Sequence, residues 1–197
     1  AILILVPAVR FLLYPAGPKR ARLKATNNCR QIIISLKAYA ADHQGHYPDG
    51  ATANEAFRKL IQEGQLEDER FFSAPASPFL PDNDLGEPPD YVKALEAGEN
   101  HWAMTKGLTD ESDGNTPAVF ENPAVKSWPP QWDKSVAGQA KPGRAWKGYK
   151  IIVGRNDGSV SIEKLKEGGS MATLAPIKDG KNLFELAGPH EILDVEE

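Results

Sequence analysis

The stretch RLKATNNCRQIIISLKAYAADHQGHYPDG, residues 22–50, carries the strongest structural signal in the chain of 197 residues. From Arg20 to Asp42 there is neither glycine nor proline, and apolar residues recur at steps of three and four. This spacing predicts one helix of about six turns with a single apolar stripe that can pack on a sheet. Gly45 and Pro48 predict its end. The stripe consists of Ala25, Cys29, Ile32, Ile33, Leu36, Tyr39 and Ala40.

The residues before this helix, AILILVPAVRFLLYP, are almost all apolar. The run is shorter than the roughly 20 residues that cross a bilayer, and no Met precedes Ala1. We therefore interpret residues 1–18 as the remainder of a hydrophobic stalk or anchor, and residues 19–197 as one globular head. A buried core segment is the alternative. Basic residues at 19–24 favour a position at a membrane edge. The expected membrane and assembly contacts are Ile2, Leu3, Ile4, Leu5, Val6, Phe11, Leu12 and Leu13.

A second, shorter helix follows the first. Thr52 and Glu55 form a capping-box pattern at its start, and Gly64 predicts its end. Proline-rich segments at 70–99 and 123–143 predict long loops.

The remainder of the chain shows the pattern of strands. Two antiparallel hairpins are predicted, at 101–122 and 147–165, the second with Asp157-Gly158 as a two-residue turn. A last short strand is predicted at 182–186, and the acidic end DVEE is expected to fray. Helices first and antiparallel strands afterwards predict an α+β fold, with the long helix packed on the sheet.

Composition excludes several classes of function. The formal net charge is −4, so nucleic acid is not an expected partner. The single cysteine, Cys29, excludes an intramolecular disulfide and a cysteine-rich zinc site. Because Cys29 lies on the apolar stripe, we expect a buried and inert thiol.

Few residues carry the pattern of a chemical site. His43 and His46 are three residues apart, but a zinc site would need further ligands. The motifs G-x-S-x-G, G-x-G-x-x-G and the P-loop are all missing from the sequence. Four tryptophans could line a sugar platform or fill the core: Trp102, Trp128, Trp132 and Trp146. Weak calcium candidates lie in the turn TDESDGN, which is rich in oxygen ligands: Asp110, Glu111, Asp113 and Asn115.

Residues 22–50 resemble bacterial type IV pilin-like and type II secretion pseudopilin-like proteins. The matching positions are Asn28, Arg30, Gln31, Ile32, Leu36, Tyr39, Ala40, Asp42, Gly45, Tyr47 and Pro48. That family also often carries a His that is separated by nine residues from an Asp-Gly turn. Here Lys147 stands at that spacing before Asp157-Gly158, and the prepilin processing motif does not occur in these residues.

The resemblance implies a non-catalytic subunit of a secretion or pilus-related assembly. Such a subunit is anchored in the inner membrane with its head outside the cytoplasm, and it binds other pilin-like subunits through its N-terminal helix. It implies no cofactor, with calcium as a minor possibility in some members. The alternative is a membrane-tethered extracytoplasmic domain that binds glycans or other ligands, or that hydrolyses a substrate, and uses a pilin-type helix for export.

Overall fold

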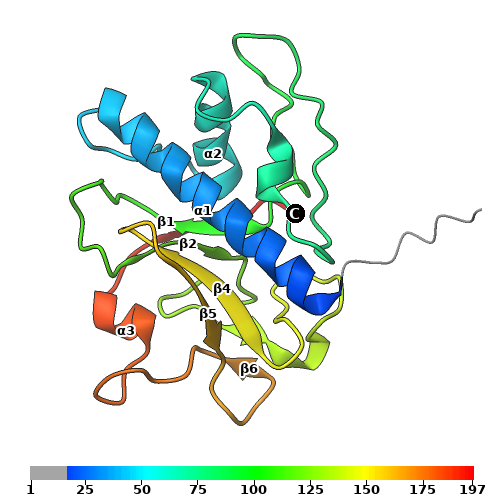
Figure 1. Cartoon of the computed structure of the whole chain (residues 1–197), viewed down its shortest axis with the longest axis vertical. Coiled ribbons are helices and arrows are strands. Elements are labelled where there is room, and N and C mark those ends of the chain that lie inside the picture. Colours follow the sequence, from blue (N-terminus) through cyan, green and yellow to red (C-terminus); the bar gives the residue numbers. More distant parts are fainter. Residues whose placement is uncertain (1–16) are drawn as a thin grey trace, which may run out of the picture.

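The long N-terminal helix is the dominant element of the computed structural model, which describes residues 17–197. This helix, α1, spans Pro18–Asp42 and crosses one face of an antiparallel sheet (Figure 1). Its end follows the predicted pattern: the Gly45 N–H donates to the carbonyl oxygen of Ala40, and Gly45 has φ +84°. The prediction of one unbroken helix over Arg20–Asp42 is confirmed. The expected contacts of the apolar N-terminal run fall on residues 1–16, outside the described part of the chain.

The sheet has five strands in the order β5-β4-β2-β1-β7, and every neighbouring pair is antiparallel. Both predicted hairpins are confirmed, and their strands β2 and β4 pair at the centre. The α+β class is therefore established. The strands are β1 (Trp102–Thr105), β2 (Pro117–Glu121), β4 (Lys150–Arg155), β5 (Val160–Lys164) and β7 (Ile192–Leu193).

The apolar stripe of α1 forms the main core with one face of this sheet. Cys29, Ile32 and Leu36 are fully buried, together with Val119 of β2 and Ile152 of β4. The expectation of a buried, inert thiol is supported, because burial and the nearby Glu121 carboxylate raise the pKa of Cys29. The short helix α2 (Ala53–Gln62) adds its apolar face to the same core.

A second layer covers the opposite face of the sheet, and the sequence reasoning missed it. Ile151 and Val153 point away from α1 into a separate cluster that contains Trp132 and Phe184. Both faces of β4 are therefore buried. The elements of this layer are β3 (Trp132–Asp133), η2 (Lys134–Val136), β6 (Met171–Ala172) and α3 (Leu183–Ala187).

The strand predicted at 182–186 is wrong, because these residues form α3. The Asn182 side chain accepts from the N–H groups of Phe184 and Glu185, and the Glu185 carboxylate accepts from the Asn182 N–H. This reciprocal capping box fixes the first turn of a helix. At α2 the predicted box is only half formed: Thr52 accepts from the Glu55 N–H, whereas Glu55 accepts from Ala51.

The turn of the second hairpin is also longer than predicted. Arg155 and Ser159 are joined by a backbone hydrogen bond, and the Gly158 N–H donates to the Arg155 carbonyl. The loop therefore has three residues, a turn followed by Gly158 at φ +89°. Only Gly158 requires the left-handed region, while the Asp157 carboxylate accepts from the Ser159 N–H.

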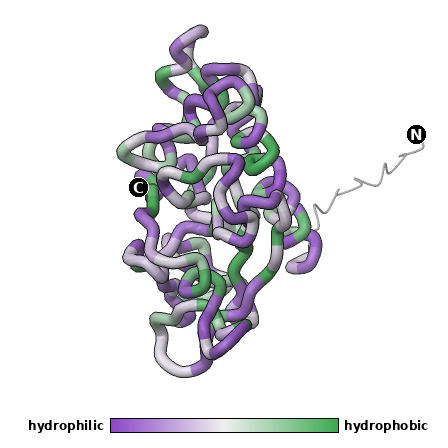
Figure 2. The backbone as a smooth tube through the Cα atoms, turned by 90° about the vertical axis from the view of Figure 1, so that its left-hand side faces the viewer, coloured by the Kyte–Doolittle hydropathy of each residue, from purple (hydrophilic) through white to green (hydrophobic). Residues whose placement is uncertain are grey.

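The C-terminal residues are fixed rather than frayed, which corrects the expectation for DVEE. The Ala53 N–H donates to the Asp194 carbonyl, and the Gly98 N–H donates to the Glu196 carbonyl. Val195 is buried. Figure 2 places the C-terminus on one side of the molecule and the first turn of α1 on the other. Within residues 17–197, no helix combines the length and the hydrophobicity that a bilayer crossing requires.

Candidate functional site

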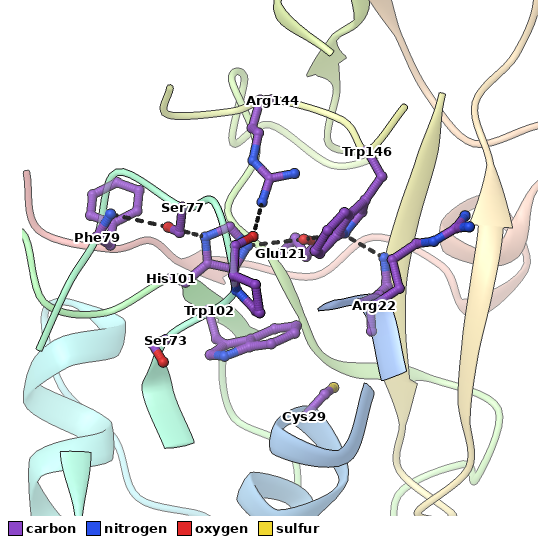
Figure 3. Close-up of polar contacts among 12 residues, drawn as sticks. Arg22, Cys29, Ser73, Ser77, Phe79, His101, Trp102, Glu121, Arg144 and Trp146 are labelled. Carbon is purple, nitrogen blue, oxygen red and sulfur yellow. Dashed lines mark hydrogen bonds and ion pairs between the residues drawn. The ribbon is translucent and has the colours of Figure 1, made fainter. Parts of the chain in front are cut away.

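A buried carboxylate, Glu121, is the centre of a polar network in the core (Figure 3). It lies at the end of β2 and is fully buried. Its oxygens accept from the indole N–H of Trp146 at 2.8 and 2.9 Å, and from the Ile152 backbone N–H at 2.8 Å. His101 Nε2 lies 3.0 Å from Oε1. Several donors thus replace the water that a buried carboxylate loses.

His101 is held in one orientation by its neighbours. Its Nδ1 lies 2.8 Å from the Ser77 hydroxyl, whose oxygen accepts from the Phe79 N–H at 3.0 Å. Ser77 therefore donates to Nδ1, and the proton of the neutral imidazole sits on Nε2, facing Glu121. Complete burial lowers the pKa of His101 below 6.5, and the Arg144 charge acts in the same direction, against the opposing effect of Glu121.

Ser77, His101 and Glu121 have the residue types of a hydrolase triad. A nucleophilic serine must present its oxygen to a substrate. Ser77 is 4% exposed, and its oxygen already accepts from the Phe79 N–H. The donors run from Ser77 to His101 and from His101 to Glu121, as in a triad, but all three side chains are buried. The arrangement resembles a satisfied buried cluster more than an open catalytic site.

Arg144 is the least satisfied member of this region. Its Nη2 donates to the Pro75 carbonyl at 3.2 Å, and its guanidinium lies 4.5 Å from the ring centre of Trp146. The side chain is 1% exposed, yet Nε and Nη1 have no hydrogen-bond partner among the described residues. Burial lowers the pKa of Arg144, but an arginine remains charged in proteins. This cation borders a pocket at the first turn of α1.

A second group of acids, Glu69, Asp82 and Glu99, was not anticipated from the sequence. Their oxygens lie within 4.8 Å of one another. Burial raises the pKa of both Glu69 and Glu99. The Glu69 carboxylate accepts from the backbone of Leu95 and Asn83. These acids organise the loop at 80–99 and offer oxygen ligands to a cation, but their separation along the chain gives no sequence signal.

The calcium candidates predicted from the sequence lie in the loop between β1 and β2. Asp110, Glu111, Asp113 and Asn115 are all exposed. The Asp113 carboxylate accepts from the Asn115 backbone, as in an ordinary polar turn. Within residues 17–197, the only set of three acids whose oxygens converge is the unanticipated one. Calcium binding in this turn therefore stays a prediction.

The two histidines considered for zinc are not brought together as a metal site. His43 stacks on Tyr39 and donates from Nδ1 to the Tyr39 carbonyl, and its Nε2 lies 3.3 Å from the Glu63 carboxylate. His46 is exposed and forms a bridge with Thr109. Both ring nitrogens of His43 thus have partners from the protein.

The tryptophans fill the interior, which was the alternative to a sugar platform. Trp102 and Trp132 are completely buried, and Trp146 is 6% exposed. Trp128 is half-buried between Phe184 and His190, and its indole N–H donates to the Phe184 carbonyl. A glycan platform needs exposed ring faces, so these residues offer little surface for one.

No family model, curated protein or solved structure matches this chain.

Proposed function

We propose that this protein is a non-catalytic, pilin-like or pseudopilin-like subunit of a secretion or pilus-related assembly. In this proposal it is anchored in the inner membrane, with its head outside the cytoplasm. The observation that carries the proposal is the position of α1. Its apolar face is buried along the helix from Ala21 to Ala40, whereas Pro18, Lys19 and Arg20 before it are exposed. Figure 1 shows the first turn of α1 at the edge of the head. The apolar run 1–15 precedes this exposed end.

The outer surface of α1 also supports a role in assembly. Leu23 is 60% exposed and Ile34 is 51% exposed, and Leu23 lines a groove beside Val160 and Ile162 of β5. Subunits that associate through helices bury such apolar side chains against each other, at about 25 cal/mol per Å². In the proposed assembly, these two residues extend the contact that begins in the stalk.

The polar network around Glu121 supports the non-catalytic part of this proposal. A catalytic serine, histidine and acid must face a cavity that admits a substrate. Ala76, Arg144 and Trp146 line the nearby pocket, but Ser77 and His101 are not among its lining residues. The network is better suited to holding β1, β2 and β4 together than to acyl transfer.

Vesicle flotation of the full chain tests the anchor. Wild-type protein should float with vesicles of phosphatidylethanolamine and phosphatidylglycerol and should self-associate without detergent. A Leu5→Asp/Leu12→Asp variant should lose both properties, because charges in the apolar run oppose burial in lipid. Leu80→Asp is the matched control, since Leu80 is exposed in a loop of the head. A full chain that stays monomeric and does not float would contradict the proposal.

A further inference from the structure

The pocket beside Arg144 has a volume of about 380 Å³. It lies between the first turn of α1, the turn at Ala76 and the loop that carries Gly138 and Trp146. Its size lies within the usual range for small-molecule sites, about 300–1,000 Å³. The walls combine small apolar side chains, such as Ala21, with the Trp146 ring. Such walls suit the flat apolar body of a small ligand.

The charge of the pocket has one sign. Arg22, Arg144 and Lys147 line it, and none of the residues that line it is acidic. The buried Glu121 carboxylate acts on Arg144 through its charge, but its hydrogen bonds go to His101, Trp146 and a backbone N–H. The pocket is therefore positive in a protein whose net charge is −4.

The unpartnered nitrogens of Arg144 indicate which kind of ligand group the pocket can bind. Arg144 has one acceptor, the Pro75 carbonyl. A buried cation with too few acceptors is unfavourable, and a guanidinium recognises carboxylates particularly well. Nη1 and Nε lack partners within residues 17–197. Residues 1–16 contain no Asp or Glu, so that segment has no acidic side chain to offer. An anion bound in the pocket would supply an acceptor that also offsets the positive charge.

We propose that this pocket binds a small organic carboxylate with an apolar body. Its carboxylate accepts from the Arg144 guanidinium, and its body packs on Trp146 and Ala21. The Lys147 ammonium at the rim adds attraction to the negative charge. This inference is independent of the proposed assembly role, because every contact it uses lies within the head.

A titration by nuclear magnetic resonance tests the site with phenylacetate as the probe. The full chain is labelled with ¹⁵N, and the Trp146 indole signal is assigned with a Trp146→Phe variant. Phenylacetate should shift this signal in a saturable manner. Phenylacetamide has the same shape without the charge, so its affinity should be lower by about tenfold or more. Equal binding of the two compounds would overturn the proposal.

Two pairs of variants locate the binding. Arg144→Met should weaken phenylacetate binding about tenfold or more, since a charge-assisted hydrogen bond is lost. Ala21→Met should obstruct the pocket and weaken binding comparably, whereas Ala41→Met, on the exposed side of α1, should change nothing. Lys147→Gln should weaken binding by about twofold to threefold through the lost charge, with exposed Lys141→Gln as its control.

The remaining outcomes are also decisive. If Arg144→Met does not fold, Ala21→Met and the neutral probe still decide between binding and no binding. Unchanged affinity in Ala21→Met would place the ligand elsewhere and overturn the proposal. Inorganic phosphate that competes as strongly as phenylacetate would overturn the assignment of an apolar carboxylate, because phosphate has no apolar body.

Discussion

Gly154 of β4 lies against Cys29 of α1, so closely that no side chain fits between the helix and the sheet at this point. A Cβ atom built on Gly154 would be 2.8 Å from the Cys29 sulfur and 3.3 Å from the Val119 carbonyl oxygen. It would also overlap the Cδ1 atom of Ile33. Cys29 Sγ itself lies 3.7 Å from the same carbonyl. The absence of a side chain at Gly154 thus sets the distance between the two main layers.

Gly154→Ala should lower the free energy of unfolding by about 1–3 kcal/mol, the usual cost of overpacking a core. The measurement is urea denaturation followed by circular dichroism. Ile33→Val removes the Cδ1 atom that a new methyl group would meet, so it should recover part of this loss in the double variant. If the losses of the two single variants simply add in the double variant, contact with Ile33 is not what prevents a side chain at position 154.

Gly158→Ala should destabilise the protein by roughly 1 kcal/mol, because φ is +89° and alanine rarely adopts this conformation. Thermal unfolding measures the effect. Gly17→Ala is the control, since Gly17 has φ −54° and open space around it. A calcium titration of the wild-type protein and of Gly158→Ala should give the same result for both. An unchanged melting temperature with lost calcium binding would mean that the turn is a functional site.

The stability of the protein should fall as the pH decreases from about 7 toward 5. The unfolded chain binds a proton at His101 near pH 6.5, whereas burial and Arg144 hold the folded pKa of His101 lower, despite Glu121. The unfolded state therefore gains protons first in this window. His101→Gln should flatten the dependence, measured by urea denaturation at several pH values. His46→Gln, at an exposed position, should keep the wild-type slope. If His101→Gln has the same slope as the wild-type protein, His101 is not the cause of the pH dependence.

Tyr47→Phe should cost about 1 kcal/mol, the typical value of one buried hydrogen bond. The Tyr47 hydroxyl donates to Asn156 Oδ1 at 2.7 Å, and the Asn156 amide donates to the carbonyls of Thr109 and Ser112. The pair thus joins the end of α1 to two loops.

Alkaline titration adds a second test of Tyr47. Burial, together with Asp110, raises the pKa of Tyr47 from 10.0 to about 12. Between pH 10 and about 12 the folded state retains this proton while the unfolded state loses it. The free energy of unfolding should therefore fall as the pH rises through this range. Tyr47→Phe should reduce that fall. Tyr149→Phe is the control, because Tyr149 is 51% exposed.

The main helix and both hairpins could be predicted because their signals are local. The apolar stripe of α1 repeats over six turns, and turn residues flank each strand. The second layer escaped prediction because β3 and β6 have only two residues each, too few for any periodicity. In the segment NLFEL, apolar residues suggested a strand, while Asn182 and Glu185 carried the helix signal that proved decisive.

The polar network could not be predicted in the same way. Glu121, His101 and Trp146 lie in three separate segments and meet only when the sheet forms. The available signal was a single acid at the end of the apolar run PAVFE, which gives no indication of its partners. Arg144 lies in a Pro- and Trp-rich loop, where neither burial nor exposure follows from spacing.

The position of β7 has a consequence for biosynthesis. This strand completes the sheet beside β1, and the Thr52 hydroxyl at the start of α2 donates to the Glu196 carboxylate at 2.5 Å. Along the chain, these residues come after every other strand of the sheet. Until they have been synthesised, β1 keeps an unpaired edge and α2 lacks this contact. The native sheet can therefore close only after β7 has left the ribosome, and before that an incompletely folded chain is accessible to chaperones.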